Sequence, residues 1–160
     1  MDRAGEKIKV ISIGEFVSRL FALRKESSEI PAGQITVPEL LRFGHFRGWL
    51  EDSDERNSTA PLNRQTAARI THEFLRLELK IPDLADISPA TKLKDLYTCR
   101  VCANHIAQIY CRGIMSTKKE EPDFQNISDS SELFFYHQAL LTKEEADKVI
   151  ANCEAVKQSI

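Results

Sequence analysis

Helix-opening signals of one kind recur along the chain, and they constrain its fold more than any other feature. In a capping box, a Ser or Thr just before the helix and a Glu three residues later each bond the other's backbone N–H. This spacing occurs at 12–15, 36–39 and 142–145, and Asn63 offers a fourth cap shortly after Pro61. Apolar residues flank each start as in a hydrophobic staple, so four helices are predicted to begin at these points.

Apolar residues recur at helical spacing after these starts and predict how far the helices run. The first helix is expected to run to about Arg24, the second to end at Gly48, and the third to end before Pro82. A further helix is predicted near 95–112, with Gly113 just beyond its end. One core is expected to contain Phe16, Leu20, Ile70, Phe74, Leu77, Ile106, Ile109 and Val149.

Strand signals are scarce, so the sequence predicts an all-α fold, with residues 1–160 as a single helical domain. The 160 residues suffice for one core, and 42% of them are apolar, as in ordinary globular proteins. A net charge of −2 gives no broad attraction to nucleic acid or to anionic membranes. No apolar run approaches the roughly 18 residues of a membrane span. The aromatic run 134–136 is too apolar for a free loop and is expected to dock on the core.

The predicted helices also repeat in a fixed order. Segments 46–50 and 110–115 are alike, each with an aromatic residue, an Arg, a Gly and two apolar residues. Each is followed by a polar loop and a capped amphipathic helix, and one capped helix stands alone in front of them. The repeat pieces are 11–24, 36–79 and 95–154, and they predict a bundle of helix–loop–helix units.

This order of pieces resembles the S-layer homology domain. In that family one helix ends in Gly-Ile or Gly-Val, a polar loop follows, and a second helix opens with Thr-Arg-Ala-Glu. The matching openings here are 12–15, 63–66 and 142–145, and the matching helix ends are 48–49 and 113–114. The resemblance implies a pseudo-threefold bundle on a bacterial cell surface, with grooves between repeats that bind anionic cell-wall polysaccharide.

The same resemblance implies that Arg64 is the best-placed ligand-binding residue, followed by Lys143. A cation in the first turn of a helix lies beside free backbone N–H groups and the positive end of the helix dipole, which together attract an anion. Trp49 is the candidate to stack on a sugar ring. The alternatives are an Arg64 that is merely solvated and a Trp49 that fills the core.

Cysteine spacing offers a different hypothesis, a zinc site. Cys99, Cys102 and His105 are spaced so that on one helix they would lie roughly on one side, and Cys153 or His137 is a candidate fourth ligand. The alternative is that the four cysteines are mostly unpaired, buried thiols and that no metal is required for folding.

The remaining chemical signals are weaker. The acidic segment 52–57 is a calcium candidate, whose alternative is a solvated loop. Because no nucleophile motif, phosphate-binding glycine loop or paired-carboxylate signature occurs, neither enzymatic activity nor a cofactor is predicted. Three functions stay open: a wall-binding module, a helical protein-interaction domain and a zinc protein. The first places the chain at the cell surface after removal of an upstream signal; otherwise we expect a cytoplasmic protein.

Overall fold

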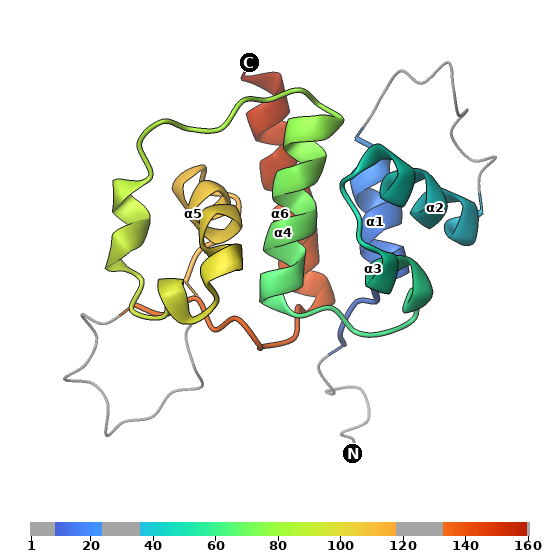
Figure 1. The fold of residues 1–160 in the computed structure, drawn as a ribbon, viewed down its shortest axis with the longest axis horizontal. Coiled ribbons are helices and arrows are strands. Elements are labelled where there is room, and N and C mark those ends of the chain that lie inside the picture. The colour runs from blue at the N-terminus through green and yellow to red at the C-terminus, as the bar shows by residue number, and fades with distance from the viewer. Residues whose placement is uncertain (1–8, 24–35, 118–132, 160) are drawn as a thin grey trace.

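The computed structural model describes residues 9–23, 36–117 and 133–159, and these are predominantly helical, which confirms the predicted all-α class. In Figure 1, α4 crosses the middle of the molecule, with α5 on one side, α1 on the other and α6 behind it. No helix within the described ranges is long and apolar enough to cross a membrane. The elements are α1 (Ile13–Phe21), α2 (Val37–Arg47), α3 (Asp52–Arg56), α4 (Arg64–Leu77), η1 (Ser88–Lys92), η2 (Leu96–Thr98), η3 (Arg100–Cys102), α5 (Ala103–Cys111) and α6 (Lys143–Gln158).

Four helices begin where the sequence predicts, because their capping residues make the expected hydrogen bonds. Thr36 and Thr142 form complete capping boxes. Ser12 and Asn63 each accept a hydrogen bond from the backbone N–H three residues later. At the other end, α2 stops at Gly48, whose φ of 97° is a left-handed conformation that favours glycine.

The helix predicted over 95–112 is the main difference between expectation and structure. Only its last part is α-helical, as α5, and the rest forms the short 3₁₀ turns η2 and η3. The cause is tertiary, since the Asp95 carboxylate accepts hydrogen bonds from the N–H groups of Phe135 and Tyr136, at 2.8 and 2.7 Å. The aromatic run thereby docks on the core as an irregular segment, with Phe135 fully buried.

Two smaller differences concern helix ends and loops. Helix α1 ends at Phe21, and its predicted end at Arg24 lies outside the described residues. The predicted loop after α2 contains the short helix α3, where the Asp54 carboxylate accepts the Glu51 N–H at 2.8 Å. The acidic segment is therefore partly a helix, in place of the solvated loop expected from its composition.

Three helix openings meet in a closed ring of hydrogen bonds. Ile11, Leu62 and Leu141 each directly precede a helix cap, and all three are fully buried. The N–H of Ile11 donates to the C=O of Leu141 at 3.2 Å, that of Leu141 to Leu62 at 2.7 Å, and that of Leu62 to Ile11 at 3.2 Å. Each segment gives one hydrogen bond and receives one, so the starts of α1, α4 and α6 are related in a cycle.

A second cycle joins the first residues of the same helices, and it has a consequence for ligand binding. In α4, the Arg64 N–H donates within this cycle. The following two N–H groups, of Gln65 and Thr66, donate to the His137 carbonyl at 3.0 Å and to the Asn63 side chain at 2.8 Å. The first turn of α4 therefore has no free N–H group to offer an anion, contrary to the expectation for Arg64. In this second cycle, the backbone N–H of Ile13 donates to the Ala60 carbonyl at 3.0 Å, that of Arg64 to the Ala139 carbonyl at 2.8 Å, and that of Lys143 to the Lys9 carbonyl at 2.9 Å.

The buried apolar side chains form one cluster. All the predicted core residues belong to it except Leu77, which is partly buried and packs against it. Trp49 also belongs to the cluster, 1% exposed, with its ring edge-on to Phe74 and the ring centroids 4.9 Å apart.

Candidate functional site

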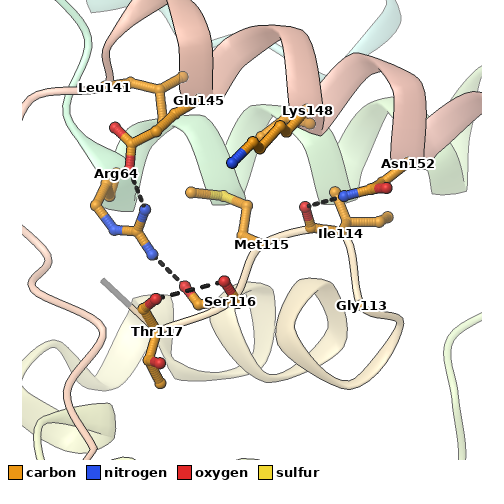
Figure 2. Close-up of a pocket in the computed structure, with 11 residues that line it drawn as sticks. Arg64, Gly113, Ile114, Met115, Ser116, Thr117, Leu141, Glu145, Lys148 and Asn152 are labelled. Atoms are coloured by element: carbon orange, nitrogen blue, oxygen red, sulfur yellow. Dashed lines mark hydrogen bonds and ion pairs between the residues drawn. The ribbon is translucent and has the colours of Figure 1, made fainter. Parts of the chain in front are cut away.

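A cavity of about 300 Å³ lies between α6 and the segment that follows α5. Figure 2 shows Arg64 and Glu145 at one end of it, with Lys148 and Asn152 further along α6. The cavity lies where the matching helix end at 113–114, which we call an A-type helix end, meets the next capped helix, α6; this is where the resemblance predicts a groove. We call it the Arg64 groove, lined by Arg64, Gly113, Ile114, Met115, Ser116, Thr117, Leu141, Glu145, Lys148, Val149 and Asn152.

Arg64 fastens three segments of the chain together. Its Nε donates to the Phe135 carbonyl at 2.8 Å, Nη1 to the Glu145 carboxylate at 2.9 Å, and Nη2 to the Ser116 carbonyl. The guanidinium also lies over the Phe135 ring, 4.5 Å from its centroid. At 3% exposure Arg64 is buried, so the alternative of a merely solvated side chain is wrong.

Burial lowers the pKa of the Arg64 guanidinium, and the Glu145 carboxylate offsets only part of that effect. An arginine stays protonated in any case. Glu145 is itself fully engaged, since one oxygen accepts the Thr142 N–H at 3.0 Å in the capping box and the other accepts from Arg64. The Arg64–Glu145 ion pair therefore lines this end of the groove, and other hydrogen bonds hold both side chains in place.

Lys148 is the cation that the groove leaves available. It is exposed, and it has no ion-pair partner among the residues that the structure describes. The charged lining comprises Arg64, Glu145 and Lys148, which leaves one net positive charge. Further along α6, the Asn152 amide donates to the Ile114 carbonyl at 3.1 Å and ties the segment after α5 to the helix. Sequence reasoning missed Lys148, although it lies one turn after Glu145 on the same face of α6.

The other two predicted site residues lie elsewhere. Lys143 is half-exposed at the start of α6, with its Nζ 3.6 Å from the Glu15 carboxylate, and does not line the Arg64 groove. Trp49 is buried, and its indole N–H donates to Glu78 at 3.0 Å. A ring buried in this way cannot stack on a sugar, so Trp49 fills the core.

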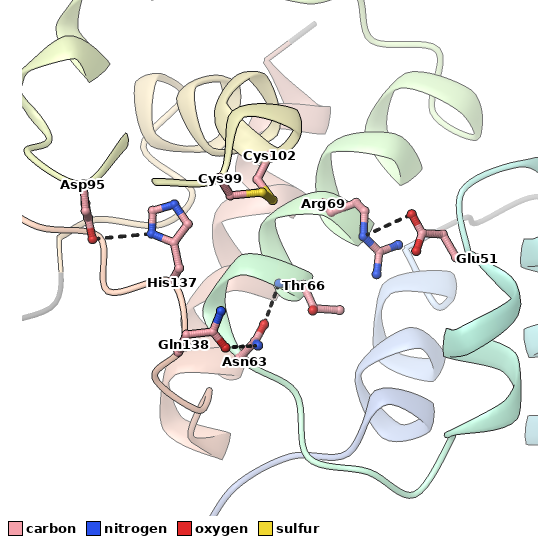
Figure 3. The surroundings of a disulfide bond; sticks show 9 residues. All are labelled: Glu51, Asn63, Thr66, Arg69, Asp95, Cys99, Cys102, His137 and Gln138. Atoms are coloured by element: carbon pink, nitrogen blue, oxygen red, sulfur yellow. Dashed lines mark hydrogen bonds and ion pairs between the residues drawn. A yellow bond between two sulfur atoms is a disulfide. The ribbon is translucent and has the colours of Figure 1, made fainter. Parts of the chain in front are cut away.

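The cysteines differ from both sequence hypotheses. Cys99 and Cys102 form a disulfide in the turn before α5 (Figure 3), whereas Cys111 and Cys153 are free. Because disulfide sulfurs are not thiolates, the predicted zinc set of Cys99, Cys102 and His105 is not available in this structure. His137, a candidate fourth ligand, instead lies 3.4 Å from the Asp95 carboxylate.

In the acidic segment 52–57, the calcium candidate, the carboxylate of Asp54 has other partners. Asp54 is 3% exposed, and both of its oxygens accept hydrogen bonds from Arg69, each at 2.9 Å. Glu51 lies 3.8 Å from the same guanidinium (Figure 3). Desolvation opposes the charge on Arg69, but its hydrogen bonds to Asp54 and the surrounding carboxylates raise its pKa overall.

Comparison with protein-family models, with curated proteins and with solved structures finds no significant match.

Proposed function

We propose that the protein is a non-catalytic binding module whose Arg64 groove takes an anionic sugar of a bacterial cell-wall polymer. The observation that carries this proposal is that the Lys148 ammonium has no ion-pair partner among the described residues, beside a cavity whose other two charges, Arg64 and Glu145, pair with each other. The cavity is bounded by an A-type helix end and the following capped helix, as the resemblance to S-layer homology domains implies. The ring of hydrogen bonds among the three helix openings supports the pseudo-threefold arrangement of that family.

The chemistry assigns different roles to the two cations. Lys148 contacts the anionic group of the sugar directly, because its ammonium has three donors and no competing carboxylate among the described residues. Arg64 positions the groove by holding Ser116 and Glu145 in place, and adds positive charge from below. The direct ligand is thus Lys148, in place of the Arg64 expected from the family pattern.

Co-sedimentation with purified bacterial cell walls tests the proposal. Wild type is expected in the pellet, and Lys148→Ala is expected to bind about tenfold more weakly, the equivalent of about 1.4 kcal/mol. Raised salt should weaken wild-type binding because an exposed charge is screened. Lys143→Ala is the matched control, since it removes a cation from the same helix but outside the groove. A wild type that stays in the supernatant, or equal losses in both variants, would exclude wall binding here.

The alternative function is a protein-interaction domain, favoured by apolar side chains on the surface. Phe46 and Val101 are each 85% exposed, and Tyr97 is 64% exposed. A photo-cross-linking residue at position 101 tests it, with the same residue at exposed Arg42 as control. Cross-linking to one defined partner from position 101 alone would favour this function over wall binding.

A further inference from the structure

Two histidines from different helices face each other where α4 packs on α5. The Nδ1 atoms of His72 and His105 are 2.8 Å apart. His72 is 4% exposed, and the side chain of His105 is 18% exposed. At this distance the two ring nitrogens share one proton in a hydrogen bond, and both could bind one ion if they moved slightly apart.

Asp83 fixes the tautomer of His72. Its Oδ1 lies 2.8 Å from Nε2 of His72, and because a carboxylate only accepts, Nε2 carries the proton. In the neutral ring Nδ1 is then a bare lone pair that faces His105. A carboxylate placed behind a histidine in this way is the arrangement that orients metal-binding imidazoles. The second oxygen of Asp83 accepts from the Asn104 amide at 3.5 Å, which steadies the carboxylate against α5.

Glu73 supplies a third donor atom. Its Oε2 is 4.0 Å from Nδ1 of His105, while its Oε1 accepts from Nε of Arg76 at 3.1 Å. The donor atoms of His72, Glu73 and His105 all lie within 4.8 Å of one another. Around a tetrahedral zinc ion with bonds of about 2.0–2.1 Å, neighbouring donors are about 3.3 Å apart. The distances of 2.8 and 4.0 Å lie on either side of that value, and no pair of the three donor atoms is more than 4.8 Å apart, so side-chain rotations would be needed to bring all three around one ion.

We propose that His72, His105 and Glu73 bind one Zn²⁺ ion, with water as the fourth ligand. Two imidazoles and a carboxylate form a donor set that zinc accepts, whereas calcium and magnesium take oxygen ligands. The ion links α4 to α5, and the partial exposure of Glu73 and His105 gives it a path from solvent. This site shares only His105 with the cysteine set suggested by the sequence.

Calorimetric titration of the chelator-treated full chain with zinc chloride tests the site. One ion per chain is expected, and His105→Ala should lower the affinity at least tenfold. Asp83→Asn is the second variant, because it keeps all three ligands and changes only the orienting carboxylate; a 10- to 100-fold loss is expected. It also keeps the proposal testable if His105→Ala fails to fold.

Controls separate this site from the other candidates. His45→Ala, which alters an exposed histidine beside Glu55, should bind zinc as wild type does. The double variant Cys99→Ser, Cys102→Ser should also keep its zinc, and the Co²⁺ complex of the wild type should show no thiolate charge-transfer band. The proposal is overturned if wild type binds no stoichiometric ion, if both His105→Ala and Asp83→Asn match wild type, or if only the cysteine variant loses binding.

Discussion

Arg69 on α4 and Lys148 on α6 occupy the same position relative to the caps of their helices, yet their surroundings differ in charge. Arg69 is held by both oxygens of the buried Asp54, which α3 brings to it. Lys148 faces the Arg64 groove with no acidic partner among the described residues. The two helices are alike in this respect, and the difference lies in what packs beside them: α3 places a carboxylate against Arg69, whereas the described lining 113–117 beside Lys148 contains none.

The largest effect is expected at the neutralised site. Asp54→Ala leaves the Arg69 charge largely buried without its main partner, which typically costs about 3–5 kcal/mol. The free energy of unfolding in urea measures this loss. Asp52→Ala is the control, because Asp52 pairs with Arg56 in solvent and should cost no more than about 0.5 kcal/mol. If Asp54→Ala and Asp52→Ala lose the same small amount of stability, the Arg69 site is as accessible to solvent as the Arg64 groove.

A smaller loss is expected at the Arg64–Glu145 end of the groove. Arg64→Ala leaves the Glu145 carboxylate and the Phe135 and Ser116 carbonyls without their shared donor, and should cost about 2–4 kcal/mol. Urea unfolding again measures it. Arg42→Ala, at an exposed arginine of α2, serves as the control. A loss of under about 0.5 kcal/mol in the free energy of unfolding of Arg64→Ala would show that Arg64 is a surface residue.

The comparison can also be tested by making the groove resemble the Arg69 site. Thr117→Asp adds a carboxylate to the lining that contains Lys148, so wall binding should fall about tenfold. Stability should change by less than about 1 kcal/mol, since the new pair is exposed. Thr117→Asn has the same shape without the charge and should bind as wild type. Equal binding by the two variants would show that charge in this groove does not govern recognition.

The smallest effect is expected at Cys153, which lies on the buried side of α6. Burial raises the pKa of its thiol to about 12, so at pH 8 only roughly one molecule in ten thousand carries the reactive thiolate. A thiol reagent should therefore leave Cys153 unlabelled at pH 8. Lys148→Ala should not change this, as the lysine lies on the exposed side. Faster labelling in that variant would show that Lys148 also holds α6 in place.

The sequence predicts the helices well because their caps are local. The bonds of Ser12, Thr36, Asn63 and Thr142 reach only three residues along the chain, and periodicity locates the core in the same way. The burial of Arg64 was not predictable, since its partners at Phe135 and Ser116 are far away in the sequence. The same applies to the helix lost after Asp95, whose carboxylate is engaged by the distant aromatic run.

The candidate sites follow the same division. A lone lysine such as Lys148 carries no sequence signal until the segment opposite is known. The histidine pair is also invisible in the sequence, because His72 and His105 meet only when α4 packs on α5. The Cys99–Cys102 spacing was visible, but spacing alone does not distinguish a disulfide from a pair of metal ligands.

The ring of hydrogen bonds through Ile11, Leu62 and Leu141 joins segments that lie far apart in the sequence. Each helix opening completes its backbone hydrogen bonding only when the other two are present, so no unit is self-sufficient. We expect all-or-none folding, in which the chain gains its native structure only after a segment near residue 140 has returned to one near residue 11. A ribosome-bound chain that has not yet exposed Leu141 therefore holds two unfinished helix starts, and folding on the ribosome is expected to wait for α6.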